Sequence, residues 1–295
     1  MNISLVDVDG HNFPNLALMK LSAWHKAQGA SVDWYSPLFS CPDCIYASKV
    51  FTFTPDYTAY APGHPEPIRG GTGYYPEEKL PDEIERMIPD YSLYPNWTAA
   101  IGFLTRGCIR NCPWCIVPKK EGGLREVDDI GRLAAGRKEV VLLDNNFLAA
   151  DPDFVREQLE KIARLKLRID FNQGLDARLV TQENAKLLSA CSWIRFIRFS
   201  CDTVAMIEPI RRAVSLIRER GVKREIFCYM LVKDIADAEI RLRALVDLKV
   251  TPFAQPYRDF TSDSTPTEEQ RRFASFVNVK GGKLCRKMSF SEYKK

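Results

Sequence analysis

A regular alternation of apolar, strand-like runs with amphipathic helices constrains this chain more than any other feature of its sequence. From about residue 98 onward, six such runs alternate with five helical stretches. The expected strands cover 101–105, 138–143, 168–172, 194–200, 225–231 and 250–255, and the expected helices cover 124–135, 151–165, 181–190, 203–220 and 234–247. Strands joined by helical crossovers pair in parallel. The pattern predicts an α/β unit built as a partial (βα)6 TIM-like barrel, whose chemistry lies at the carboxyl ends of the strands.

The first hundred residues predict a separate α/β unit. Apolar runs at 3–7, 31–35 and 49–54 are expected strands, and a further strand end runs into a glycine turn at 67–73. Helices are expected at 16–28 and 81–88. This order indicates a parallel, doubly wound, Rossmann-like sheet. The expected domains are therefore 1–97, 98–262 and a C-terminal helix with a basic tail over 263–295.

Three cysteines within eight residues follow the first strand of the second unit. They are Cys108, Cys112 and Cys115, spaced by three residues and then by two. Thiolates hold iron–sulfur clusters, which normally take four of them, and no fourth cysteine stands near. A closed zinc site needs a second ligand pair at a fixed distance, which this sequence lacks. The run therefore predicts a cluster with one iron left open to another ligand, against the alternatives of a zinc site or three buried thiols.

Polar side chains gather where the expected strands of the second unit end. They are Asp144 and Asn145 after the second strand, Asn172 and Arg178 after the third, Arg198, Ser200, Cys201 and Asp202 in or after the fourth, Tyr229 in the fifth and Tyr257 after the sixth. Each one alone is also an ordinary strand cap or turn residue. Together they suit a zwitterionic nucleoside ligand.

The cysteine run resembles the signature Cys-x-x-x-Cys-x-aromatic-Cys of the radical S-adenosylmethionine (SAM) superfamily, and Trp114 fills the aromatic position. The resemblance implies a [4Fe-4S] cluster on the three cysteines. Its open iron would chelate SAM, and reductive cleavage would release a 5′-deoxyadenosyl radical. It also implies that Asp144 and Asn145 bind the SAM ammonium and that Asn172 lies near SAM. Arg178 or Arg198 would pair with the SAM carboxylate, and Ser200 and Asp202 would contact its ribose. Cys201, Tyr229 and Tyr257 are expected as substrate-side or radical-relay groups, with pocket lining as the alternative.

The first unit is similar to the cobalamin-binding domains that precede many radical SAM domains. His11 stands in the loop after the first strand, where that family has its cobalt-coordinating histidine, and Gly70 and Gly71 match the glycine pair beside a nucleotide-like tail. Pro14 replaces the next glycine of that motif. Two interpretations stay open, bound cobalamin or a domain that keeps the fold for substrate or partner contact.

A second cysteine pair, Cys41-Pro-Asp-Cys44, lies in the first unit. It is a redox pair, half of a metal site, a set of ligands for an auxiliary cluster, or a pair without function, since two ligands do not make a site.

Charge divides the chain unevenly. Residues 1–100 carry 6 Lys/Arg against 12 Asp/Glu, and residues 101–295 carry 36 against 26. The basic second part suits an anionic partner such as RNA, or is an ordinary solvated surface. No apolar run approaches the roughly 20 residues of a membrane span. The 9 cysteines argue against a disulfide scaffold, so we expect a cytoplasmic protein with no membrane partner, and the resemblance implies a reductant such as flavodoxin or ferredoxin.

Two other functions remain open on the sequence. A methylthiotransferase-like tRNA-modifying enzyme would need an N-terminal three-cysteine cluster domain, for which only Cys41 and Cys44 are available, and a β-rich RNA module, for which the tail is short. A non-catalytic iron–sulfur or metal-binding protein is the other alternative. The substrate is not evident from the sequence.

Overall fold

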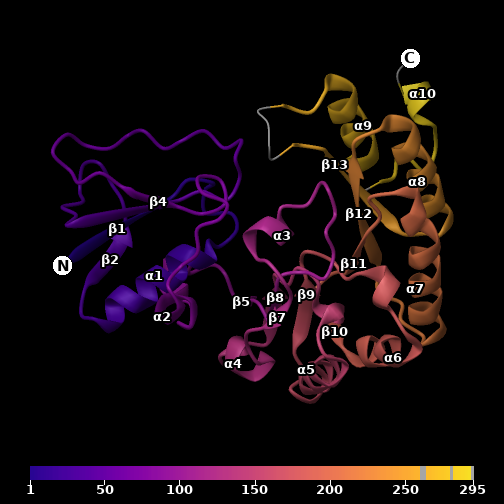
Figure 1. Ribbon diagram of the computed structural model, residues 1–295, viewed down its shortest axis with the longest axis horizontal. Coiled ribbons are helices and arrows are strands. Elements are labelled where there is room, and N and C mark those ends of the chain that lie inside the picture. The colour runs from indigo at the N-terminus through magenta and orange to yellow at the C-terminus, as the bar shows by residue number, and fades with distance from the viewer. Residues whose placement is uncertain (260–263, 280–281, 294–295) are drawn as a thin grey trace. The chain divides into compact units, whose positions relative to one another are not determined.

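The computed structural model describes residues 1–259, 264–279 and 282–293. The chain forms two compact units, one of Met1–Ile101 with Lys119–Glu121 and one of Gly102–Pro118 with Gly122–Lys295 (Figure 1). Both units combine helices with parallel sheets, so the predicted α/β class is confirmed. No helix in the described ranges is both long enough and apolar enough to cross a membrane.

The first unit is built on a four-stranded parallel sheet in the order β2-β1-β3-β4. Its strands are β1 (Asn2–Asp7), β2 (Ser31–Trp34), β3 (Cys44–Ser48) and β4 (Ile68–Gly70). Its helical segments are α1 (Leu16–Ala27), α2 (Asp82–Glu85) and the 3-10 turn η1 (Tyr91–Leu93). Helix α1 begins at Asn15, whose side-chain oxygen accepts from the Leu18 amide and whose side-chain nitrogen donates to Ser48. One residue thus caps the helix and ties it to the sheet.

The third strand of this unit lies at Cys44–Ser48, so the predicted strand at 49–54 is wrong. Ile45 and Ala47 are buried, whereas Phe51 and Phe53 are about half exposed. The Asp9 carboxylate accepts from the backbone of Val50 and Phe51. These amides are used by a side chain, so the segment is a loop, although its apolar composition is typical of a strand.

The second unit contains two parallel sheets. One has the order β10-β9-β8-β5 and the other β11-β12-β13. The strands of these sheets are β5 (Ala100–Gly102, whose first two residues belong to the first unit), β8 (Glu139–Leu142), β9 (Arg168–Phe171), β10 (Ser192–Trp193), β11 (Ile197–Ser200), β12 (Ile226–Val232) and β13 (Thr251–Pro256). Parallel pairing joins β8, β9 and β10 and, separately, β11, β12 and β13. A parallel bridge between Leu175 and Phe199 links the two sheets.

Two of the predicted strands are divided. The run at 194–200 is divided between the two sheets. The Ile194 amide, directly after β10, bonds to the Ile169 carbonyl in β9, whereas the Ile197 amide, at the start of β11, bonds to the carbonyl of Glu225 directly before β12. The run at 101–105 becomes β5 and β6 (Thr105–Arg106). Strand β6 pairs antiparallel with β7 (Arg125–Glu126).

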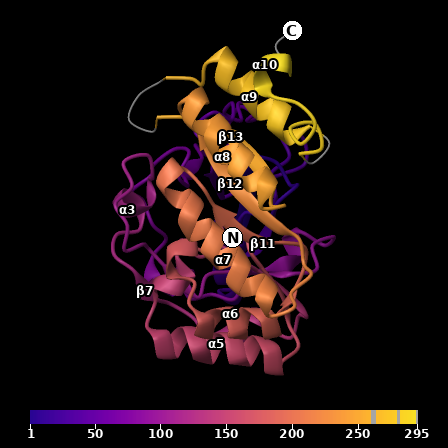
Figure 2. The same cartoon turned by 90° about the vertical axis from the view of Figure 1, so that its right-hand side faces the viewer.

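The helices of the second unit follow the strands in chain order. They are α3 (Val117–Lys120, which ends within the first unit), α4 (Ile130–Ala134), α5 (Pro152–Arg164), α6 (Gln182–Ala190), α7 (Ile207–Glu219), α8 (Ile235–Asp247), α9 (Glu268–Asn278) and α10 (Phe290–Tyr293), with the 3-10 turns η2 (Phe147–Ala149), η3 (Ala177–Leu179) and η4 (Val204–Met206). Figure 2 faces the layer formed by α5 to α8. The Asp151 side chain caps the start of α5. The predicted helix at 124–135 is shorter, because 125–126 pairs as a strand and Asp129 caps α4.

The C-terminal segment packs on the second sheet. Asn278, at the end of α9, accepts from the Ala254 amide at 2.8 Å and donates to the Ala254 carbonyl at 2.9 Å. Phe273 and Phe276 are fully buried. The expected C-terminal helix is therefore part of the core of the second unit. Residues 260–262 of the expected barrel domain and residues 263, 280–281 and 294–295 of the expected tail lie outside the described part of the chain.

Candidate thiol and polar site at the strand ends

The three cysteines lie on one loop between β6 and β7. The loop is closed by a hydrogen bond from the Cys108 amide to the Gly122 carbonyl at 3.4 Å, and the Cys115 amide donates to the Cys112 carbonyl at 3.0 Å. Gly107 has φ +84°, and a β-carbon there would overlap the Gly123 carbonyl. Only glycine fits this close approach, so the residue before the first cysteine sets the path of the loop.

The thiols influence one another electrostatically without forming a completed metal site. Burial raises the pKa of Cys112 and of Cys115. The Cys108 thiol raises both further, and the Cys112 thiol also raises the pKa of Cys115. All three are free. Within the described ranges, no three His, Cys, Asp or Glu side chains are gathered closely enough to hold a metal ion. The loop thus carries the right donors, but their sulfur atoms do not converge.

Asp144, directly after β8, anchors the chain that leads into this loop. Its carboxylate accepts from the Thr105 amide at 2.6 Å, the Thr105 hydroxyl at 2.7 Å and the Leu104 amide at 3.2 Å. The side chain is 2% exposed, and burial raises the pKa of Asp144 to about 6 despite these bonds. Thus both carboxylate oxygens of Asp144, predicted to bind the SAM ammonium, already bond to the protein.

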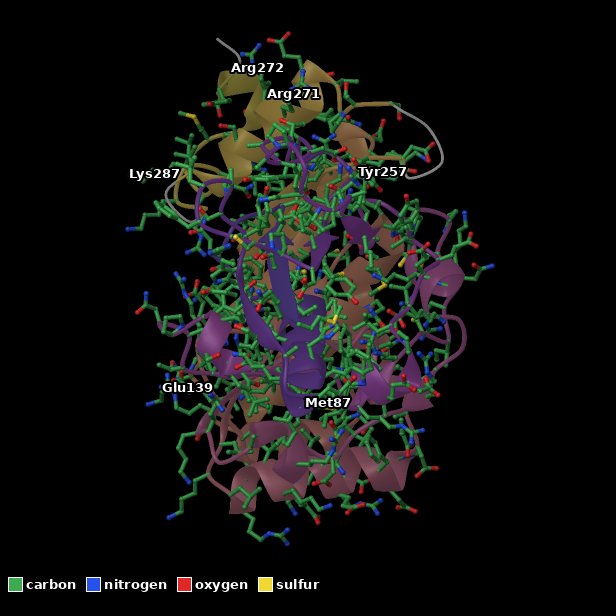
Figure 3. The ribbon with its side chains drawn as sticks, turned by 90° about the vertical axis from the view of Figure 1, so that its left-hand side faces the viewer. Met87, Glu139, Tyr257, Arg271, Arg272 and Lys287 are labelled. Atoms are coloured by element: carbon green, nitrogen blue, oxygen red, sulfur yellow. The ribbon has the colours of Figure 1, made fainter. Side chains whose placement is uncertain are left out.

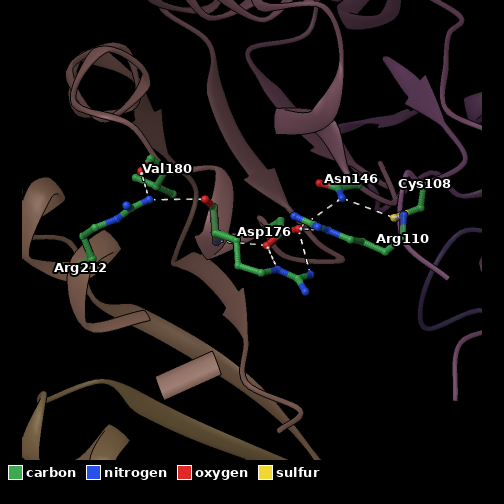
Figure 4. Close-up of polar contacts among 7 residues, drawn as sticks. Cys108, Arg110, Asn146, Asp176, Val180 and Arg212 are labelled. Carbon is green, nitrogen blue, oxygen red and sulfur yellow. Dashed lines mark hydrogen bonds and ion pairs between the residues drawn. The ribbon is translucent and has the colours of Figure 1, made fainter. Parts of the chain in front are cut away.

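The next two residues extend this anchor to the thiols. Asn145 accepts from the Gly107 amide at 3.0 Å. Asn146 donates from its side-chain nitrogen to the Cys108 sulfur at 3.4 Å and to Asp176 at 3.5 Å (Figure 4). The side-chain oxygen of Asn146 is buried and has no hydrogen-bond partner among the described residues. Sequence reasoning did not select Asn146, although it continues the same polar run.

Asp176 joins the loop to the end of the third strand. It accepts from Arg178 Nε at 2.7 Å, from a second nitrogen of the Arg178 guanidinium at 2.9 Å, and from Arg110 Nε at 3.2 Å (Figure 4). Burial acts to raise the pKa of Asp176, but the Arg178 hydrogen bonds and charge outweigh it and lower that pKa. Arg178, a predicted SAM contact, therefore lies in an ion pair beside the cysteine loop. Its charge also lowers the pKa of Cys112, against the larger effect of burial.

Arg198 and Tyr229 form a second polar group. Arg198 binds Asp170 through two nitrogens at 2.6 Å and 2.7 Å and donates to the Tyr229 hydroxyl at 3.0 Å. Tyr229 in turn donates to the backbone carbonyl of Asn172 at 3.0 Å. Three predicted residues thus lie together, but all three guanidinium nitrogens of Arg198 already have protein partners.

The end of the fourth strand is held by a buried arginine that sequence reasoning missed. Arg241 is 1% exposed and donates to the carbonyls of Cys201 and Leu231 at 2.7 Å and 2.9 Å. Its spacing of four residues from Asp237, with which it pairs, was the only signal in the sequence. Asp202 accepts from the Leu231 amide at 2.9 Å, and burial raises its pKa, while a hydrogen bond from Ser200 lowers it. The charge of Asp202 also raises the pKa of both Cys112 and Cys115, so Asp202 lies close enough to the loop to act on its thiols.

The other candidates differ in their surroundings. The side chain of Cys201 is fully buried, and burial raises the pKa of its thiol to about 12, which suits a core residue. Tyr257 follows β13 (labelled in Figure 3), and Lys233 Nζ lies 5.2 Å from its ring centre. Trp114 is partly exposed.

In the first unit, His11 stacks on Trp34 with ring centres 4.1 Å apart. Gly71 has φ +94°, and a β-carbon there would overlap the Lys49 carbonyl. The close approach that requires this glycine is therefore made by the unit's own backbone. A β-carbon at Gly70 would meet no described atom within 4 Å, so this position does not require glycine for space. Cys41 is exposed and Cys44 half-buried, and both are free thiols.

The carboxyl ends of β8, β9 and β11 thus bring together thiols, carboxylates, amides and a guanidinium around one loop. This set contains the donor types of a thiolate-ligated metal centre with a polar ligand beside it, although the three sulfur atoms do not converge in the structure. No family model matches this sequence, and no curated protein is matched by it either.

Proposed function

We propose that this protein is a radical SAM enzyme whose cysteine loop holds a [4Fe-4S] cluster through Cys108, Cys112 and Cys115. The observation that carries the proposal is the position of this loop at the carboxyl ends of parallel strands, with the Asn146 amide on the Cys108 sulfur. Carboxyl ends of parallel strands are where α/β proteins of this kind place their chemistry.

The strand order supports a partial (βα)6 barrel for the second unit. Strands β8 and β9, and then β11, β12 and β13, follow one another in chain order with parallel pairing, and the bridge from Leu175 to Phe199 connects the two sets. In the first unit, the order β2-β1-β3-β4 supports a doubly wound, Rossmann-like arrangement. In this proposal cobalamin, if the enzyme uses it, belongs to the first unit.

The donor set fits the cluster in kind and number. Three thiols on one loop are the ligands that leave one iron open, and coordination couples to local ordering of a ligand-bearing loop. When bound, the cluster supplies the electron that cleaves SAM to a 5′-deoxyadenosyl radical. The chain's own residues position the loop. Asp144 accepts from the Thr105 amide before the loop, Asn145 accepts from the Gly107 amide, and Asn146 donates to the Cys108 sulfur.

Arg178 is the better candidate than Arg198 for the SAM carboxylate. Arg178 lies beside the thiols and uses Nε and only one terminal nitrogen in its ion pair with Asp176. Its side chain is 37% exposed, against 14% for Arg198. A guanidinium with access to solvent, and with one nitrogen that has no partner among the described residues, can still bind an incoming carboxylate. Asp202 and Asn172 are the proposed polar contacts on the neighbouring strand ends.

The test is anaerobic reconstitution of the full chain with iron and sulfide, followed by SAM and dithionite. We expect about four irons per chain and production of 5′-deoxyadenosine. Cys108→Ser, Cys112→Ser and Cys115→Ser should each lose both. Cys41→Ser, an exposed cysteine outside the loop, serves as the matched control and should retain both.

Two results would overturn the proposal. Iron incorporation without SAM cleavage would favour a non-catalytic iron–sulfur protein. A single zinc per chain with no SAM consumption would favour a structural metal site. If Cys41→Ser alone lost part of the iron, an auxiliary site in the first unit would be required, as in the methylthiotransferase-like alternative.

A further inference from the structure

A cavity of about 350 Å³ opens at the amino ends of strands in the second unit, at the opposite strand ends from the cysteine loop. It is formed by the starts of β9 and β10, the end of α6 and the loop between α7 and β12. Its polar lining residues are Arg168, Ser189, Ser192, Arg220, Lys223 and Arg224. A cavity of this size is large enough for a small ligand.

The lining is strongly basic, and most of that charge is uncompensated. Arg168 pairs with Glu139 and donates to the Ile194 carbonyl. By contrast, the side chains of Arg220, Lys223 and Arg224 make no hydrogen bond or ion pair with any residue in 1–259, 264–279 or 282–293. No acidic residue is among the described residues that line the cavity. The neighbouring Glu225 is bonded to Thr251.

Stabilisation of helix ends does not account for these cations. Cations near helix carboxyl ends often bond to the terminal carbonyls, and Arg218 does so, donating to Leu248 and Lys249 at 2.7 Å and 3.1 Å. Arg220, Lys223 and Arg224 make no such bond in the described part of the chain. Their charges are therefore available to a ligand.

The remaining polar groups at the cavity are also suited to an anion. Ser192 adds an exposed hydroxyl. Guanidinium, ammonium and hydroxyl groups all donate hydrogen bonds, and a phosphate group offers several charged acceptor oxygens.

We infer that this cavity binds a phosphate-bearing anion through Arg220, Lys223 and Arg224. Three cations within one short loop match a ligand that carries more than one negative charge. The phosphate can belong to a free anion or to the backbone of a nucleic acid. The inference does not depend on the cysteine loop or on the proposed enzymatic activity.

The experiment measures binding of inorganic phosphate, adenosine monophosphate and a short single-stranded RNA to the full chain by calorimetry. The test variant is Lys223→Glu/Arg224→Glu. The matched control, Arg272→Glu/Lys287→Glu, makes the same change of charge at two exposed positions outside the cavity (Figure 3). Circular dichroism and thermal unfolding check that both variants are folded.

We expect the cavity variant to weaken binding by about 10-fold or more, and the control by less than about 2-fold. RNA that binds more tightly than phosphate, with a steep dependence on salt, would identify a nucleic-acid backbone as the source. Equal binding of phosphate and the nucleotide, without that advantage, would identify a free anion. Absence of binding by all three probes, or an equal loss in both variants, would overturn the inference.

Discussion

At the carboxyl ends of the strands in the second unit, Asp144, Asp176 and Arg241 are largely buried and each is bonded to two or more partners. At the amino ends, Arg220, Lys223 and Arg224 are exposed and have no bonded partner in the described part of the chain. At the carboxyl ends, the charged side chains hold the backbone in place, because a buried ionised group is tolerated only when it is hydrogen-bonded or paired. At the amino ends, the exposed cations cost little free energy to leave unpaired in water, and they can bind a ligand. The predictions below test whether this contrast holds.

The largest effect is expected for Asp144→Ala. The change leaves the Leu104 amide and both donors of Thr105 without their acceptor in a buried site, which should cost about 4 kcal/mol. Urea unfolding followed by circular dichroism measures it. Asp153→Ala, whose side chain is 84% exposed, should change stability by less than about 0.5 kcal/mol, and similar losses in the two variants would remove the contrast.

Arg241→Met should follow at about 3 kcal/mol, because two strand-end carbonyls lose their buried donor. The measurement is the same unfolding experiment. Arg211→Met is its control, since Arg211 is 55% exposed and pairs with Glu208 on the surface. A cost below about 1 kcal/mol would show that Arg241 is not needed to hold the ends of β11 and β12.

The buried carboxyl also predicts a dependence of stability on pH. Burial raises the pKa of Asp144 from 3.8 to about 6, so the folded state holds its proton where the unfolded state has released it. The contribution is therefore fully present below about pH 4 and is lost as pH rises to about 6, for a change of roughly 2 to 3 kcal/mol. Asp144→Asn should lack this component. When the free energy of unfolding is plotted against pH, the curves of wild type and variant should therefore not run parallel over that interval. Parallel curves would contradict the prediction.

An intermediate effect is expected for Asn146→Ala, and it rests on the proposed cluster. Loss of the hydrogen bond to the Cys108 sulfur should lower iron retention by about 10-fold, as is common when the partner of a ligand is removed. Competition with a chelator measures retention without any assay of activity. Gln182 is an exposed amide at the start of α6, and Gln182→Ala should retain iron like the wild type. If Asn146→Ala also retained iron like the wild type, the role given to the Asn146 amide would be contradicted.

The smallest effect is expected for Arg224→Gln. Removing one of three neighbouring unpaired cations should change the free energy of unfolding by less than about 0.5 kcal/mol, with a slight gain because like charges repel. Thermal unfolding at low salt is the appropriate measurement. A loss above 1 kcal/mol would show that Arg224 has a structural partner, and the contrast between the two edges would fail.

Much of the secondary structure was predictable because it depends on local sequence. Asp151 with Pro152 predicts the start of α5, and Gly221 predicts the end of α7, because caps and glycine act within a turn of the helix. The errors arise where a distant side chain takes backbone amides. Asp9 binds those of Val50 and Phe51, and Asp144 binds those of Leu104 and Thr105, so apolar composition alone predicted strands there.

The sequence by itself determined the α/β class, the alternation of strands and helices, and the spacing of three cysteines on one loop. These follow from periodicity and from the order of residues along the chain. Only the tertiary structure decided that Asn146 meets Cys108, that Arg241 holds two strand ends, and that Arg198 is already paired with Asp170 while Arg178 keeps a nitrogen unbonded. Those contacts join residues up to 40 positions apart, and which of several arginines reaches which carboxylate depends on the packing of strands and helices that no local pattern specifies.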